Sequence, residues 1–179
     1  MGITNIETGE EEYYGKEALK KEDRNIILRA STSLPIVSPI VTIKGKKYLD
    51  GGIGDPIPIK RAFEEGCDKV IVVLTRDRNY KKSATKGRWF FDILYRKYPK
   101  LIELIFNRHE RYNSILEYIR EMEKEGKAFV VAPEKPIEID KFEKSKEKLF
   151  EVYKLGFADG TKVFEKYKEF LDIEGHQKK

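Results

Sequence analysis

The apolar run at residues 69–75, Lys-Val-Ile-Val-Val-Leu-Thr, constrains the fold more than any other segment of the chain. Such a short continuous run is typical of a strand that is buried on both faces, as in a parallel sheet. It follows residues 59–65, which the pattern predicts as a helix, and Gly66 is placed to end that helix. Helix, glycine and strand form half of a βαβ unit, so the sequence predicts an α/β fold with a mainly parallel sheet.

The rest of the chain divides into short predicted elements. Residues 40–49 read as a β-hairpin with its turn at 44–46, where Gly45 supplies a positive φ. The first residues predict a short strand, a turn at 7–9 and a return strand over 10–14. Further elements are expected as helices over 26–30, 112–122, 145–157 and 162–171, and as a second strand over 128–132. We expect the stripes Leu149/Tyr153 and Val163/Tyr167/Phe170 to pack on the sheet.

Composition excludes several classes of protein. The 36 basic residues are interleaved with 31 acidic ones, and no basic block stands apart, so nucleic acid is not expected as a partner. The net charge of +5 indicates a solvated protein surface rich in lysine and glutamate, and binding to an anionic phospholipid surface is the alternative. Cys67 is the single cysteine, so no disulfide framework is expected, and its place before the apolar run predicts a small core residue. No run approaches the ~18 apolar residues of a membrane span, and no secretory segment follows Met1, so a cytoplasmic location is the default.

Asp50, Gly51 and Gly52 directly follow the apolar strand residue Leu49. A carboxylate fixed at a strand end can accept a proton from a neighbouring hydroxyl, and glycines after it let the chain turn sharply beside that hydroxyl. Taken alone, Asp-Gly-Gly is also ordinary turn chemistry.

The segment Ala-Ser-Thr-Ser-Leu-Pro at 30–35, followed by Tyr-Leu-Asp-Gly-Gly at 48–52, resembles the bacterial patatin-like phospholipases. The likeness continues through residues 55–58, 66–73, 96–99 and 107–113. It implies a single domain over 1–179 that is the C-terminal fragment of a patatin-like domain, hence a partial patatin-like fold with a hairpin and C-terminal helices. Residues 1–78 would close the patatin core, 79–174 would form a helical region with one strand, and 175–179 would be a disordered tail.

In that family an aspartate pairs with a serine in a catalytic dyad, which implies a catalytic role for Asp50, supported by Gly51 and Gly52. The family's nucleophile lies in an upstream Gly-x-Ser-x-Gly elbow, near a glycine-rich oxyanion loop, and neither pattern occurs in these 179 residues. The resemblance thus implies part of a lipid acyl hydrolase that is inactive alone and needs no cofactor or metal. The alternative is a stand-alone α/β interaction module without chemistry.

Other candidate nucleophiles and bases fit poorly. His109 lies between Arg108 and Glu110 on a charged helix start, and His176 lies in the tail, so neither reads as a triad base or a metal ligand. Ser31 and Ser33 lack the flanking glycines of a strand-to-helix elbow. A capping or local hydrogen-bonding role near Pro35 is expected for both serines.

Residues 88–98 mix aromatic side chains with basic ones, as helices at lipid interfaces do. The hypothesis is that Trp89 and Phe90 contact lipid at the substrate entrance of the complete enzyme, which would act on a lipid or ester and touch a membrane peripherally. The alternative is a core helix whose aromatic side chains cover the sheet. A strand at 70–74 without its neighbours would expose an apolar face, so a homo-oligomer is also expected.

Overall fold

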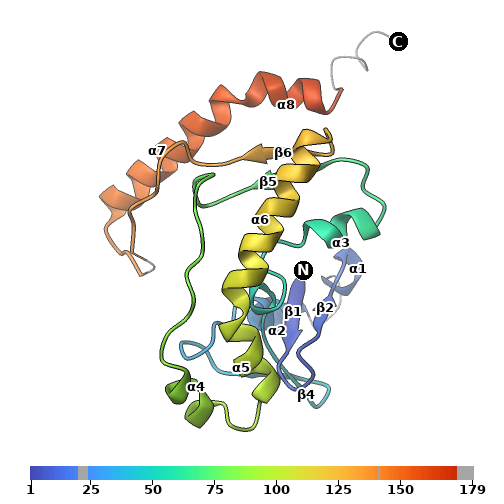
Figure 1. Cartoon of the computed structure of the whole chain (residues 1–179), viewed down its shortest axis with the longest axis vertical. Helices are drawn as coiled ribbons and strands as arrows, with labels where there is room; N and C mark the ends of the chain where they lie inside the picture. Colours follow the sequence, from blue (N-terminus) through green and yellow to red (C-terminus); the bar gives the residue numbers. More distant parts are fainter. Residues whose placement is uncertain (20–23, 141, 173–179) are drawn as a thin grey trace. The chain divides into compact units, whose positions relative to one another are not determined.

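The computed structural model of the protein describes residues 1–19, 24–140 and 142–172 (Figure 1). Their contacts form two compact units. The first unit consists of Met1–Pro58 and Lys82–Ile115, and the second unit consists of Ile59–Lys81 and Leu116–Lys179. The predicted tail at 175–179 and His176 lie outside the described residues.

A four-stranded antiparallel sheet with the strand order β2-β1-β4-β3 forms the base of the first unit. Its strands are β1 (Gly2–Asn5), β2 (Glu11–Tyr13), β3 (Val41–Ile43) and β4 (Lys46–Asp50). Both predicted hairpins are confirmed, and Lys44 and Gly45 join β3 to β4 with positive φ at both positions, as a two-residue type I′ loop requires. The expected mainly parallel arrangement is wrong for this sheet, because loops this short can connect only antiparallel neighbours.

Different helices cover the two faces of this sheet, because successive residues of a strand point to opposite sides. Tyr48 shares a hydrophobic cluster with Ile27 of α2 (Arg24–Ser31), whereas the adjacent Leu49 shares one with Leu101 of α5 (Pro99–Phe106). The predicted helix at 26–30 is therefore confirmed within α2. The first unit also contains α1 (Lys16–Leu19), the 3-10 turn η1 (Gly51–Ile53) and α4 (Arg88–Leu94). The long helix α6 (Arg108–Lys124) begins in the first unit and ends in the second.

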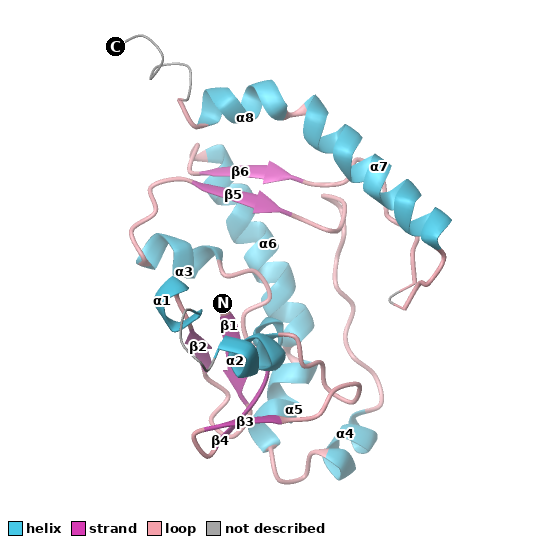
Figure 2. Cartoon of the chain, turned by 180° about the vertical axis from the view of Figure 1, so that it is seen from behind, coloured by secondary structure: helices cyan, strands magenta, loops and turns pink. Residues whose placement is uncertain are grey.

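The second unit pairs β5 (Val70–Val73) with β6 (Ala128–Val131) in parallel, with Val70 opposite Ala128 and Val73 opposite Val131 (Figure 2). The helix α3 (Ile59–Glu64) precedes β5, and Gly66 follows it with a φ of 91°, as predicted. The remaining helices are α7 (Lys146–Lys162) and α8 (Phe164–Phe170). None of the described helices is both long enough and apolar enough to cross a lipid bilayer.

Burial in the second unit differs from the prediction at β5 and at Cys67. Val72 is buried, but Val73 on the opposite face of β5 is 70% exposed, so the expected burial of both faces is wrong for the described residues. Cys67 is exposed, because it lies in the turn after Gly66 rather than within the strand. An apolar run identifies a strand, but it does not say what covers the strand.

Only one of the two predicted stripes packs on the strands. The rings of Tyr167 and Phe170 contact Phe129 of β6, with ring centroids 6.3 Å and 5.5 Å apart. Leu149 and Tyr153 of α7 are exposed instead, and Tyr153 stacks on its own helix neighbours Phe150 and Phe157. The exposed rings of α7 thus form a row along the helix surface.

Candidate active site

Asp50 is the last residue of β4, paired across the sheet with Ile3 of β1. Its backbone N–H donates to the carbonyl oxygen of Ser33 at 2.9 Å, so the strand end is also fixed to the segment after α2. Its carboxylate Oδ1 accepts a hydrogen bond from the backbone N–H of Gly52 at 2.6 Å, which caps the 3-10 turn η1. The side chain is therefore held by the turn that follows it.

Thr4 of β1 also holds the turn that follows Asp50. Its hydroxyl donates to the carbonyl oxygen of Asp50 at 2.9 Å and accepts from the backbone N–H of Gly54 at 3.4 Å. Thr4 is fully buried, and a buried hydroxyl that makes both bonds leaves the turn little freedom. This role is not predictable from the sequence, because an isolated threonine in a strand carries no distinguishing pattern.

Glycine is required at position 51 for a steric reason. A Cβ on Gly51 would overlap the carbonyl group of Gly2 on the neighbouring strand. At Gly52 a Cβ would lie 3.0 Å from Oδ1 of Asp50. Both glycines thus permit close approach of chain segments around the carboxylate.

Arg108, at the start of α6, also belongs to this site, although it is not among the site residues that the sequence predicts. Its Nε donates to the carbonyl oxygen of Gly52 at 2.7 Å. One helical turn later, Nη2 of Arg111 donates to the carbonyl oxygens of Ile53 at 2.9 Å and Leu104 at 2.6 Å. Two arginines three residues apart project from one face of a helix, and this spacing is the signal that could have indicated them.

The electrostatic environment of Asp50 contains opposing effects. Burial of the carboxyl group raises the pKa of Asp50 above its ordinary value, while the N–H of Gly52 and the charge of Arg108 act to lower it. Burial dominates, so the pKa is raised. A carboxylate with a raised pKa is a stronger proton acceptor than one in water.

A cavity of about 240 Å³ lies beside this carboxylate. Its lining residues are Gly2, Glu11, Tyr13, Ser31, Asp50, Gly51, Gly52, Asp55, Pro56 and Pro58. The carboxylate of Asp55 accepts a hydrogen bond from the Tyr13 hydroxyl at 2.5 Å, whereas no described residue donates to Oδ2 of Asp50. Oδ2 of Asp50 is therefore open to an incoming donor.

Among the described residues, no group of three or more His, Cys, Asp or Glu side chains is arranged to hold a metal ion.

The side chains of the other residues that the sequence offered as candidates form no hydrogen bond with Asp50 within the described residues. Ser33 is buried, and its hydroxyl donates to the carbonyl oxygen of Arg29 at 2.7 Å, which confirms a local hydrogen-bonding role. Ser31 lines the cavity, but within the described residues no hydrogen bond joins it to Asp50. His109 lies within hydrogen-bonding distance, 2.9 Å, of the carbonyl oxygen of Phe106 through Nδ1. In α4, Trp89 is 70% exposed and Phe90 is 41% exposed.

Residues 2–63 match the family model of the patatin-like phospholipases, and this match contains Asp50, Gly51 and Gly52. This segment is patatin-like. The patatin-like segment is followed by a match of residues 98–172 to a domain of unknown function (DUF6363), which includes Arg108. The chain is 30% identical over 135 residues to YjjU, an uncharacterized protein of Escherichia coli (strain K12). The match covers 73% of this chain and 37% of YjjU, so the chain spans well under half the length of that relative.

Proposed function

We propose that this chain is the C-terminal part of a patatin-like lipid acyl hydrolase and contributes Asp50 as the general base of a Ser/Asp dyad. The serine and the oxyanion loop would come from sequence outside these 179 residues. The observation that carries this role is the position of Asp50: its carboxylate ends a strand, lies beside a cavity, and has one oxygen fixed by Gly52 and the other open.

In the proposed reaction, Oδ2 of Asp50 accepts the serine proton while the serine oxygen bonds to the acyl carbon of a lipid or ester. The leaving alcohol takes that proton as its bond to the acyl carbon breaks. Water then repeats the sequence and releases the fatty acid from the serine. The raised pKa of Asp50 favours the first step, because it brings the affinity of the carboxylate for a proton closer to that of the hydroxyl.

The direct test is hydrolysis of p-nitrophenyl butyrate by the chain alone and by the chain co-expressed with a serine-bearing segment of a patatin-like protein. We expect activity only in the combined sample, and we expect Asp50→Asn to abolish it. Asp68→Asn, the same chemical change at an exposed position in the second unit, serves as the matched control and should leave activity unchanged. Turnover by the chain alone that Asp50→Ala abolishes would show that a nucleophile is present and would contradict the proposal.

A second candidate function is a non-catalytic α/β interaction module, favoured by the exposed rings of Phe150, Tyr153 and Phe157 on α7. The coding sequence directly upstream of Met1 distinguishes the two. An in-frame Gly-x-Ser-x-Gly motif there supports the hydrolase. A functional start at Met1 with no such motif supports the module.

A further inference from the structure

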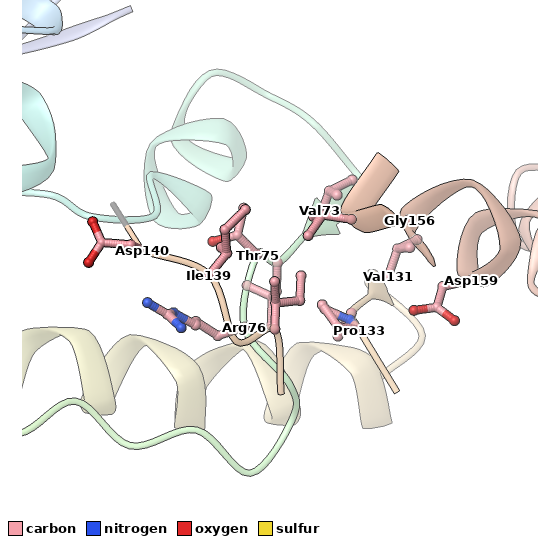
Figure 3. Close-up of a pocket in the computed structure, with 13 residues that line it drawn as sticks. Val73, Thr75, Arg76, Val131, Pro133, Ile139, Asp140, Gly156 and Asp159 are labelled. Atoms are coloured by element: carbon pink, nitrogen blue, oxygen red, sulfur yellow. The ribbon is translucent and has the colours of Figure 1, made fainter. Parts of the chain in front are cut away.

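The second unit contains its own cavity, of about 420 Å³, at the carboxyl ends of the parallel strands β5 and β6 (Figure 3). This volume falls within the range of ~300–1,000 Å³ that is usual for sites of small organic ligands. Ligands of α/β sheets bind beyond the carboxyl ends of parallel strands, since the loops that follow the strands diverge there. The position and size of the cavity both suit a small molecule.

The walls of this cavity are mainly apolar. They are built from Val73 of β5, Val131 of β6, Val152 of α7 and, from the segment after β6, Pro133, Ile137 and Ile139. Gly156 of α7 lines one side, and a Cβ placed there would meet no atom within 4 Å. A hydrocarbon chain fits such a lining, because it has no donor or acceptor that the walls would leave unpaired.

Polar side chains occupy the ends of the cavity. Figure 3 shows Arg76 and Asp159 at opposite ends of the row of apolar side chains. The Arg76 guanidinium lies 5.2 Å from the ring centroid of Tyr80 and forms no ion pair within the described residues. Asp159 is buried and accepts from the backbone N–H of Glu134 at 3.4 Å, with Nζ of Lys162 3.9 Å away.

The Arg76 end is therefore the one that can take a charged head group. Asp140 also lines this end, and the backbone N–H of Phe142 donates a hydrogen bond to its carboxylate at 2.8 Å, which compensates only part of its negative charge. A guanidinium without an ion-pair partner can bind a carboxylate through two parallel hydrogen bonds. An amine at the same place would meet the like charge of Arg76 and the opposite charge of Asp140, so a comparison of the two head groups decides which residue dominates.

We infer that this cavity binds an aliphatic monocarboxylate, a medium-chain fatty acid, with its carboxylate at Arg76 and its chain along Val73, Val131 and Val152. The site lies wholly in the second unit and contains none of the residues around Asp50. It therefore stands whether or not Asp50 is a catalytic base.

The test is calorimetric titration of the whole chain with decanoate, kept below its critical micelle concentration. Gly156→Leu fills the cavity, while Gly160→Leu adds the same side chain to the same helix at a residue that does not line it, and a Cβ there also meets nothing within 4 Å. Both changes favour the helix, so both variants should fold. We expect saturable binding that Gly156→Leu weakens by about tenfold or more and that Gly160→Leu leaves unchanged.

Decanol and decylamine test the head group. Decanoate should bind more tightly than either, and Arg76→Gln should remove the preference for decanoate over decanol. Absence of saturable decanoate binding, or equal binding to both glycine variants, would overturn the site. Decylamine that binds as tightly as decanoate would overturn the assignment of Arg76 as the carboxylate partner.

Discussion

Arg108 donates a hydrogen bond from Nε to the carbonyl oxygen of Gly52 at 2.7 Å and so connects α6 to the turn that carries the Asp50 carboxylate. The Thr4 hydroxyl also holds this turn, because it donates to the backbone carbonyl oxygen of Asp50 at 2.9 Å. The carboxylate is thus positioned by contacts from both a strand and a helix. The arginine lies within the match to the domain of unknown function, and the aspartate lies within the patatin-like match.

Replacing Arg108 with alanine should destabilise the first unit. A hydrogen bond from a charged group contributes about 1.5–3 kcal/mol, so we expect the free energy of unfolding to fall by roughly that amount in urea titrations. Arg96→Ala is the matched control, since Arg96 is exposed and its side chain has no ion pair within the described residues; its effect should stay within about 0.5 kcal/mol. Equal effects of the two variants would contradict the role of Arg108.

Stability should depend on pH through Asp50. Burial raises its pKa in the folded state, so the folded protein binds this proton more tightly than the unfolded chain does. The stabilising contribution is fully present below the ordinary pKa of 3.8 and is lost as the pH rises through the raised pKa. The unchanged protein should therefore lose free energy of unfolding as the pH rises through this pKa, whereas Asp50→Asn should not. We expect the difference in free energy of unfolding, Asp50→Asn minus the unchanged protein, to increase with pH, as measured by urea unfolding at several pH values. A difference that shrinks as the pH rises would contradict this expectation.

The sequence predicts the local part of the site but not its long-range part. Asp50 follows an apolar strand and precedes two glycines, and this local pattern is enough to predict where the strand ends. Arg108 is separated from Gly52 by 56 positions, and a charged residue on a helix start looks the same whether it faces solvent or a carbonyl oxygen. Its role therefore depends on tertiary packing.

The same distinction between local patterns and long-range contacts explains where the predicted fold was wrong. Hairpins and single helices were predictable because turn glycines and apolar spacing act over a few residues, as at Gly45 and Gly66. The burial of β5 was not predictable, because an apolar run raises the propensity for a strand without determining which residues pack against that strand. Val73 is consequently exposed although its sequence context is that of a buried strand.

Position 51 should tolerate no side chain. A Cβ on Gly51 would overlap the carbonyl group of Gly2, so Gly51→Ala must displace β1 or the turn after Asp50. Such overpacking costs about 1–3 kcal/mol, measurable as a lower midpoint of urea unfolding. Gly15→Ala introduces the same methyl group where a Cβ meets nothing within 4 Å, and it should leave the midpoint unchanged or raise it. A midpoint for Gly51→Ala equal to that of the unchanged protein would show that the close approach is not required.

The helix α4 should contribute to peripheral binding of lipid. Trp89 and Phe90 are exposed together with Ile93 and Leu94, so α4 presents apolar side chains that a membrane surface would cover. We expect Trp89→Ala to reduce co-sedimentation with anionic phospholipid vesicles by about tenfold, since burial of a large aromatic side chain contributes ~1.5–3 kcal/mol. Phe142→Ala removes a similarly exposed ring from the second unit and is the control. No loss of binding in Trp89→Ala would remove the proposed lipid contact.

A second copy of the chain should associate through the exposed rings of α7. Phe150, Tyr153 and Phe157 stack in sequence along one side of the helix, and contiguous exposed apolar side chains of this size favour association. We expect light scattering at micromolar concentration to give at least twice the monomer mass of 21.0 kDa. Tyr153→Lys should return the protein to a monomer, because a charge inserted in the row must be desolvated in the dimer. Ala158→Lys adds the same charge to the same helix outside the row and should leave the dimer intact, whereas a monodisperse monomer of the unchanged chain would contradict association.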